Sequence, residues 1–318
     1  MNRFRQKLAR MRAQCDTRDD FILVDARDAD MAGGMSAFCR PGQGMMTKAE
    51  FLADIQNVVS HDLVDMVLVS VSTHEDLLAS HLTTLRDIQL AVRANDSSDL
   101  WRIRTGTYES QKSLPFRTAT LDQALCHFGL YSLTFNGEAS HDVMVLDQFR
   151  AFRREARETG FEYFLEVFNP NQTDIDPGDF GDFLNDMITR CLAGMRRDEM
   201  PHLLKIPFNT TESLSSLCRF DPRMVIGIMG GGSGTTRDCL ELLGQAQQAG
   251  ARAALFGRKI LHAEDPVLML GMMRSVTDGV LTPAQAVEFY HQGLAERGMT
   301  PRLCVRDDCE ITESRLSR

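Results

Sequence analysis

The amino-acid sequence predicts an α/β protein, a (β/α)8 TIM barrel with an extra C-terminal helix. Three observations favour this fold class. Eight short apolar runs are spread along the chain, stretches of helical periodicity alternate with them, and no low-complexity linker divides the 318 residues. Strands that are buried on both faces have near-continuous apolar runs of this kind. Eight such units are typical of a closed parallel barrel, and a doubly wound open sheet is the structural alternative.

The predicted elements follow in chain order. The strands are expected at residues 21–25, 66–71, 100–105, 130–135, 163–168, 202–207, 224–229 and 251–257. Helical periodicity predicts helices over residues 47–60, 75–93, 146–159, 179–196 and 235–249. Gly160 and Gly250 each stand between a helical stretch and a strand, where glycine commonly ends a helix.

We expect a single domain over residues 1–318, with the barrel in about 20–280 and a C-terminal helix and tail in 281–318. The helix is predicted over residues 282–297. The polar tail that follows is of a kind that is usually disordered or forms an arm in an oligomer.

Composition and charge exclude several classes of function. The net charge of -9 opposes non-specific binding to nucleic acid or to anionic lipid. No apolar stretch approaches the roughly 20 residues that span a bilayer, and the basic N-terminal segment lacks the apolar core of a secretory signal. We therefore expect a cytoplasmic protein with no nucleic-acid or membrane partner.

Cysteine and histidine usage predicts neither a disulfide framework nor a metal site. The eight cysteines include no C-x-x-C pair, and the eight histidines show no ligand spacing. We expect reduced thiols, no metal ion and no cofactor.

Three residues at the predicted strand ends are candidates for chemistry, because barrels of this kind work at the C-terminal ends of their strands. Lys205 lies within an apolar strand, where desolvation favours the free amine that Schiff-base formation needs. Glu166 lies in the strand before it and is a candidate for proton transfer. A structural ion pair between these two residues is the alternative. Asp25 could orient the lysine or relay protons, or simply cap the following turn.

A glycine-rich loop predicts an anion site. Its residues 230–234 join a strand directly to a helix, so that backbone N–H groups and the helix N-terminus can surround an anion. It matches neither a Walker A loop nor a G-x-G-x-x-G motif in register; a tight turn is the alternative. Arg258 could supply a fixed cation, and Arg27 and Arg104 are candidates for contacting a second anion or another part of the substrate.

These residues resemble a known family. Lys205, the loop at residues 230–233, and Leu-Phe-Gly-Arg-Lys-Ile at 255–260 followed by Glu-Asp-Pro-Val at 264–267 are similar to the class I (Schiff-base) aldolase superfamily. The closest groups are archaeal-type class I fructose-bisphosphate aldolase and tagatose-bisphosphate aldolase. The resemblance is strongest over residues 203–270 and extends more thinly to 24–25 and 164–166.

The resemblance implies a metal-independent aldehyde-lyase that acts on a phosphorylated ketose, and we expect a homo-oligomer. It implies that Lys205 forms an iminium with the ketose and that Asp25 and Glu166 take acid/base roles. The residues that it implies for phosphate binding are Gly231, Gly232, Ser233, Gly257 and Arg258.

The sequence departs from the archaeal-type pattern in two places. Glu166 and Asn169 stand where that family has a strand-five tyrosine, and Asp25-Ala26-Arg27 replaces its Asp-His-Gly. Two other functions fit the same residues. One is a transaldolase-type transferase that uses the same Schiff base, and the other is a non-catalytic regulator that binds a phosphosugar.

Overall fold

The computed structural model describes residues 2–40, 44–80, 87–121, 126–230 and 234–317. Eight parallel strands form a closed barrel in the order β1-β12-β11-β10-β9-β8-β5-β4. This confirms the predicted (β/α)8 class and excludes the open sheet. The strands are β1 (Ile22–Arg27), β4 (Met66–Val69), β5 (Gln89–Arg93), β8 (Phe128–Thr134), β9 (Glu162–Phe168), β10 (Leu204–Ile206), β11 (Ile226–Met229) and β12 (Ala253–Phe256).

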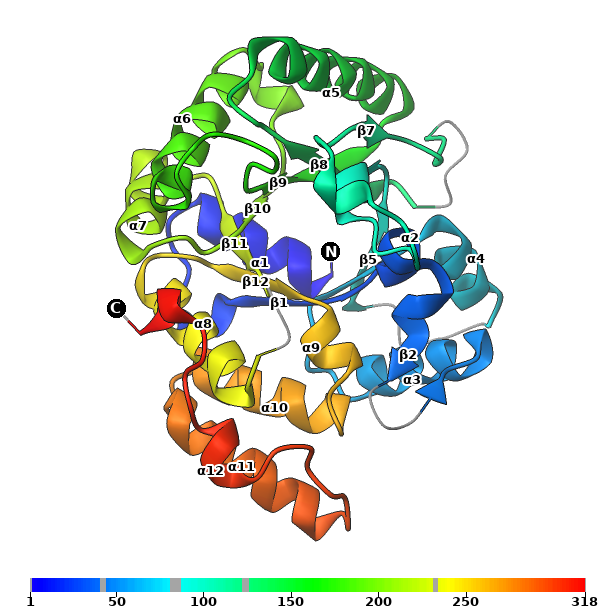
Figure 1. Ribbon diagram of the computed structural model, residues 1–318, viewed down its shortest axis with the longest axis vertical. Coiled ribbons are helices and arrows are strands. Elements are labelled where there is room, and N and C mark those ends of the chain that lie inside the picture. The colour runs from blue at the N-terminus through cyan, green and yellow to red at the C-terminus, as the bar shows by residue number, and fades with distance from the viewer. Residues whose placement is uncertain (1, 41–43, 81–86, 122–125, 231–233, 318) are drawn as a thin grey trace.

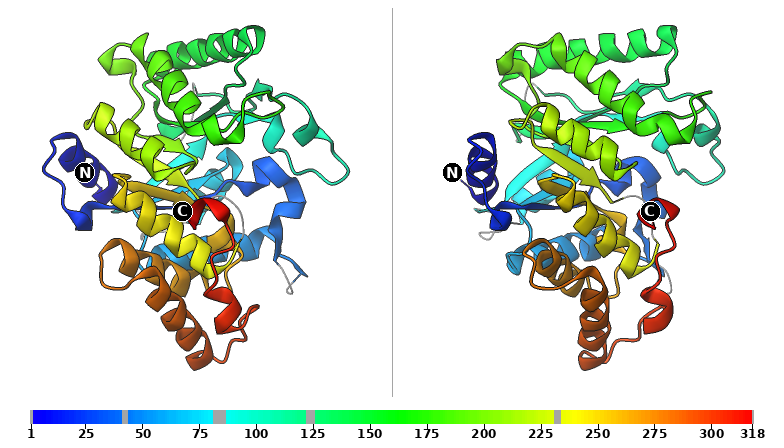
Figure 2. Two further views of the ribbon diagram at one scale, coloured as in Figure 1. Left: turned by 60° about the vertical axis from the view of Figure 1, so that its left-hand side comes forward. Right: turned by 90° about the vertical axis from the view of Figure 1, so that its left-hand side faces the viewer.

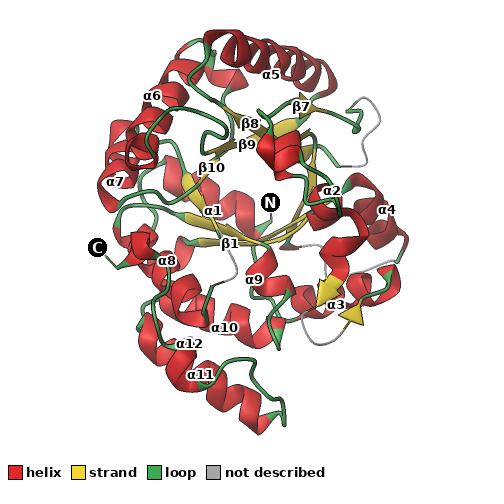
Figure 3. Cartoon of the chain, in the orientation of Figure 1, coloured by secondary structure: helices red, strands yellow, loops and turns green. Residues whose placement is uncertain are grey.

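The long helices lie outside the strands (Figures 1 and 3). They are α3 (Lys48–Ser60), α4 (Val71–Ala79), α5 (Ala139–Thr159), α6 (Phe180–Ala193), α7 (Thr211–Phe220), α8 (Thr236–Gln248), α10 (Pro266–Thr277) and α11 (Pro283–Glu296). Shorter elements follow strand ends: α2 (Ala29–Gly33), α9 (Arg258–Leu261), and the small hairpins β2 (Cys39–Arg40) with β3 (Gly44–Met45) and β6 (Asp96–Ser97) with β7 (Pro115–Phe116).

The first helix, α1 (Arg3–Arg12), covers the end of the barrel where the strands begin. The ring of Phe4 lies 5.4 Å from that of Phe128, the first residue of β8. Lys7 Nζ donates to the carbonyl of Phe21, just before β1, at 3.0 Å. Figure 2 shows this helix at one end of the molecule. The opposite end, where the strands finish, is therefore the one left for a functional site.

The third barrel strand differs from the prediction. It is β5, whereas residues 100–105 lie in the excursion between β5 and β8, and the helix expected over 75–93 ends at Ala79. Gln89 and Arg93 flank only three apolar residues in β5, which leaves a weak strand signal. The apolar character around Trp101 serves packing within the excursion instead, where the Trp101 ring lies 4.7 Å from that of Phe116.

The C-terminal tail packs on its own chain, which corrects the expectation of disorder. Beyond α11 the chain forms α12 (Val305–Asp308) and returns to α8. Asp308 Oδ1 accepts from the Thr236 backbone N–H at 2.6 Å, and its Oδ2 lies 2.9 Å from His291 Nε2. Gln245 Nε2 donates to the carbonyl of Leu316 at 2.9 Å. The tail therefore caps the N-terminus of α8 with a carboxylate, an arrangement that the helix dipole favours.

Candidate active site

A cavity of about 380 Å³ opens at the C-terminal ends of the strands. This is the face at which barrels of this kind carry their chemistry. Its lining includes charged residues from five of the strands or from the turns after them: Asp28, Arg93, Glu166, Lys205 and Arg258.

Lys205 and Glu166 form the centre of this site. They are register partners on β10 and β9, so both side chains leave the barrel wall at the same level. Lys205 Nζ lies 2.5 Å from Glu166 Oε1, and the two side chains are only 8% and 2% exposed. A buried lysine is tolerated here because a carboxylate compensates its charge. The pair places an amine and a proton acceptor side by side in a cavity wall.

Two residues that sequence reasoning missed hold the other oxygen of Glu166. Ser132, the register partner of Glu166 on β8, donates its hydroxyl to Glu166 Oε2 at 2.7 Å. Arg93, the last residue of β5, lies 3.5 Å from the same oxygen. The predicted third strand at residues 100–105 does not include Arg93, and a serine in an apolar strand carries little information by itself. That both residues contact Glu166 follows only from the pairing of β5, β8 and β9.

Asp25 and Arg27 are placed away from the cavity, which corrects both expectations. Side chains alternate along a strand, and Ala26 lines the cavity, so its two neighbours face the helices instead. Arg27 Nε donates to Asp25 Oδ1 at 2.7 Å, and Arg27 Nη1 donates to Asp54 of α3 at 2.5 Å. Burial raises the pKa of the Asp25 carboxyl although Arg27 opposes this. Asp28, on the other face, is the acid near the end of β1 that lines the cavity.

Arg104 also falls outside the cavity. Because residues 100–105 are not a barrel strand, its side chain is exposed in the excursion, where Nη2 lies 3.9 Å from Cys39 Sγ. Its neighbour Arg102 lines the cavity in its place.

One side of the cavity is suited to an anion. Gly257 and Arg258 both line it. Burial lowers the pKa of Arg258; the nearby guanidinium of Arg102 adds to this effect, and the Glu109 carboxylate opposes it. Two crowded cations gain from a bound anion. The other predicted phosphate residues, Gly231, Gly232 and Ser233, lie outside the described residues.

Gly257 has a steric reason to be glycine. A Cβ at this position would lie 2.6 Å from the carbonyl oxygen of Ala26, which is backbone and has little room to move. Only a residue without a side chain lets the end of β12 approach β1 this closely. The turn that follows β12 thereby reaches the cavity, which Gly257, Arg258 and Lys259 line.

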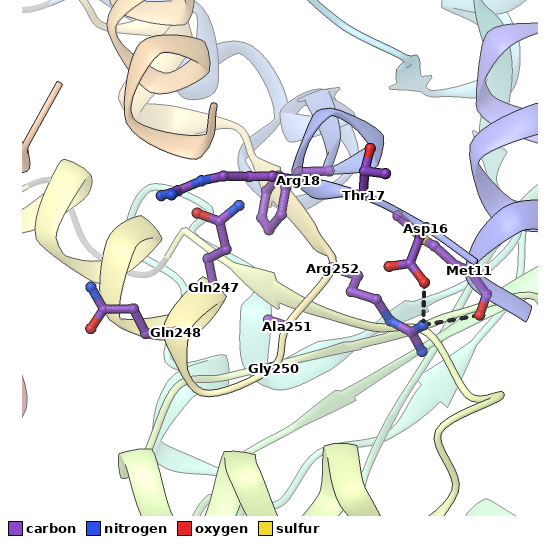
Figure 4. A pocket seen from close by; sticks show the side chains of 10 residues that line it. Met11, Asp16, Thr17, Arg18, Gln247, Gln248, Gly250, Ala251 and Arg252 are labelled. Carbon is purple, nitrogen blue, oxygen red and sulfur yellow. Dashed lines mark hydrogen bonds and ion pairs between the residues drawn. The ribbon is translucent and has the colours of Figure 1, made fainter. Parts of the chain in front are cut away.

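A second hollow lies at the other end of the barrel (Figure 4). There Arg252 Nη1 lies 3.0 Å from the carbonyl oxygen of Met11 and 3.5 Å from Asp16 Oδ1. These contacts tie the segment before β1 to the start of β12, which is a structural role typical of this face.

Within the part of the chain that the structure describes, no group of three or more His, Cys, Asp or Glu residues is arranged to hold a metal ion. Among the same residues, no helix has the length and apolar character to cross a bilayer.

The fold and this site together define a (β/α)8 barrel with a buried lysine–glutamate pair in the cavity at the C-terminal ends of its strands. No family model matches the chain, and no curated protein sequence matches it. Solved structures do match in fold. An archaeal fructose 1,6-bisphosphate aldolase superposes with a TM-score of 0.63 at 13% identity, over 86% of this chain and 99% of that one.

Two further structures are similar to the same extent. The fructose-bisphosphate aldolase from Slackia heliotrinireducens has a TM-score of 0.65 at 13% identity, over 91% of each chain. An archaeal fructose-1,6-bisphosphate aldolase whose catalytic lysine carries the carbinolamine intermediate has a TM-score of 0.63 at 14% identity, over 86% of this chain and 100% of that one. The likeness confirms, at the level of fold, the aldolase resemblance expected from the sequence.

Proposed function

We propose that this protein is a class I aldolase that cleaves or forms a C–C bond of a phosphorylated ketose through a Schiff base on Lys205. The observation that carries the proposal is the contact of Lys205 Nζ with Glu166 Oε1 in the wall of the cavity. The pair supplies a nucleophilic amine and a base to deprotonate it, which are the two requirements of covalent amine catalysis. The fold-level likeness to Schiff-base aldolases supports it.

The reaction begins with the free amine of Lys205. Glu166 Oε1 takes the ammonium proton, and the nitrogen lone pair attacks the ketone carbon to give a carbinolamine. Protonated Glu166 returns its proton to the carbinolamine hydroxyl, which leaves as water with the former carbonyl oxygen, so that a cationic iminium and an ionised Glu166 remain. The iminium is the electron sink for the next step.

Cleavage follows at the neighbouring C–C bond. Glu166 accepts the proton of the substrate hydroxyl, that oxygen becomes the carbonyl of a departing aldehyde, and the bonding pair moves into the iminium to form an enamine. Protonation of the enamine carbon and hydrolysis then release the second product and return Lys205. We propose Asp28, which follows β1 and lines the same cavity, in place of Asp25 for the acid/base role at the end of the first strand.

The phosphate end of the substrate is proposed to bind at Gly257 and Arg258, with Gly231, Gly232 and Ser233 completing the site. Binding energy at this remote group orients the ketone carbon on Lys205 without taking part in the bond change.

The test is borohydride trapping of the protein with a panel of ketose phosphates, followed by mass spectrometry and peptide mapping. A reduced adduct on Lys205 together with release of an aldehyde is the expected result. An adduct whose fragment is transferred only to an added acceptor identifies a transferase. Ligand-induced thermal stabilisation without any adduct identifies a non-catalytic phosphosugar-binding protein.

A further inference from the structure

Arg93 is a buried cation at the cavity wall that bonds to acids from three parts of the barrel. Its side chain is 6% exposed and contacts Asp28 Oδ2 at 2.6 Å, Asp96 Oδ1 at 3.1 Å and Glu166 Oε2 at 3.5 Å. Burial acts to lower the pKa of Arg93, but the three carboxylates outweigh it and raise the pKa above its usual value. Arg93 is therefore a permanent positive charge beside the proposed proton acceptor.

A closed hydrogen-bond network connects this cation to Glu166. Arg93 Nη2 donates to Ser132 Oγ at 3.1 Å, and that hydroxyl in turn donates to Glu166 Oε2 at 2.7 Å. Asn95 fixes the backbone of Ser132 from both sides, accepting from its N–H at 2.5 Å and donating to its carbonyl at 2.7 Å. Arg93 Nε also donates to the carbonyl of Asn95 at 2.9 Å, which closes the network.

The consequence is that the two oxygens of Glu166 have different environments. Oε2 has Ser132 and Arg93 as neighbours, and Oε1 faces Lys205 Nζ at 2.5 Å. We propose that Arg93, acting through Ser132, is a positioning residue that holds the Glu166 carboxylate with Oε1 on the reacting amine. This inference rests on the function proposed above and deepens it.

The proton then moves at Oε1 alone. A proton that leaves the Lys205 ammonium or a substrate hydroxyl binds Oε1, and its bonding pair stays on the nitrogen or the oxygen. Oε2 keeps its two neighbours throughout, so the carboxylate does not rotate between the steps. Loss of the network gives the carboxylate other rotamers, and a misplacement of about 1 Å can cost a reacting group on the order of 10²-fold in rate.

Two conservative variants test the positioning role. Ser132→Ala removes the hydroxyl and leaves every charge in place, while Arg93→Lys keeps the charge and loses the forked donor. We expect each to lower kcat for ketose-phosphate cleavage by about 10- to 100-fold, with little change in KM and with borohydride trapping retained. The kcat of the double variant should be no lower than that of the less active single variant, because both substitutions break the same connection to Glu166. Wild-type kcat in both single variants overturns the proposal, as do losses that multiply in the double variant.

A second buried arginine provides the matched control. Arg27 is paired with Asp25 and Asp54 on the helix-facing side of β1. Arg27→Lys should lower the melting temperature and leave kcat unchanged. If Arg93→Lys and Ser132→Ala behave in the same way, losing stability alone, then Arg93 has only a structural role.

The pH profile gives a readout that a structural role would not move. The charged groups that face Arg93 are Asp28, Asp96 and Glu166, with Lys205 behind Glu166. Arg93→Gln removes the cation from among these acids, so the acidic limb of kcat/KM should move to higher pH. Ser132→Ala removes one hydrogen bond to the carboxylate and no charge, so it should lower the plateau and move the limb less than Arg93→Gln does. An unmoved limb in folded Arg93→Gln contradicts the proposal, and if this variant does not fold, the two conservative variants decide.

Failure of the proposed function can be told apart from failure of this inference. If the wild type forms no reduced adduct with any ketose phosphate, the aldolase proposal fails. The role of Arg93 is then decided by competitive acetylation of Lys205 with acetic anhydride, mapped by mass spectrometry. Loss of a neighbouring cation favours the ammonium form, so Arg93→Gln should slow the acetylation of Lys205 relative to the wild type when both are labelled at one fixed pH. An unchanged labelling rate overturns the inference.

Discussion

Lys205 and Glu166 face each other across neighbouring strands, with Nζ of the lysine 2.5 Å from Oε1 of the glutamate. The two residues are far apart in the sequence. The parallel register of β9 and β10 sets them at one level, and the apolar strands around them keep the pair out of water.

Replacing Lys205 with arginine should abolish both cleavage and borohydride trapping. The guanidinium keeps the charge but stays protonated, so it cannot form an imine. Binding of inorganic phosphate, measured by calorimetry, should be largely retained. Lys48→Arg is the control, because Lys48 lies on α3 and its side chain is 41% exposed. A label that maps to another lysine would contradict the prediction.

Glu166→Gln should lower turnover by roughly 10²–10⁴-fold, the usual scale for a general acid or base. The amide keeps the shape of the side chain but cannot take up the proton. Removing one partner of a buried ion pair also costs about 3–5 kcal/mol, so thermal unfolding has to be measured beside kcat. A folded variant with wild-type turnover would reduce the contact with Lys205 to a structural ion pair.

Gly257→Ala should destabilise the barrel by roughly 1–3 kcal/mol, as overpacked sites do, and raise KM for phosphorylated substrates. The new Cβ would lie 2.6 Å from the carbonyl oxygen of Ala26 and push β12 away from β1. Denaturant unfolding measures the first effect and steady-state kinetics the second. Gly271→Ala is the control: it lies within α10, where an added Cβ has no neighbour within 4 Å among the described residues, and it should stabilise by about 0.5–1 kcal/mol. Equal stabilities for the two variants would contradict the argument.

Glu264 should make part of the stability depend on acid pH. Burial acts to raise the pKa of this carboxyl, but hydrogen bonds from Arg302 and Tyr290 outweigh it and lower the pKa to about 2. A depressed pKa stabilises the fold above the unfolded value of about 4.3, and this contribution is lost as the pH falls toward about 2.

The test compares the wild type with Glu264→Gln. The difference in unfolding free energy should be on the order of 1–2 kcal/mol near neutral pH, because water screens this partly exposed carboxyl, and it should shrink as the pH falls through this window. Glu296→Gln, which changes an exposed acid on α11, should show no such dependence. A difference that stays constant down to about pH 2 would show that Glu264 acts only through packing.

Two features differ from what the sequence predicts: the position of the third strand and the identity of the acid from the first strand. β5 has only Leu90, Ala91 and Val92 between its polar ends, a signal too short to separate from the helix before it. The sequence predicts Asp25 in the site because this residue ends the first apolar run. Strand periodicity alone does not say which face of a strand points into the barrel, and here that face carries Ala26 and Asp28.

The amino-acid sequence predicts the barrel class, most of its strands, and Lys205 and Glu166 as candidates, because a charge within an apolar strand is informative without any neighbour. It does not predict that these two residues touch, that Asp28 and not Asp25 faces the cavity, or that Arg93 and Ser132 contact the second oxygen of Glu166. Such contacts between strands depend on register and on which face of each strand points into the barrel. Both are set by closure of the whole barrel rather than by any local run of residues.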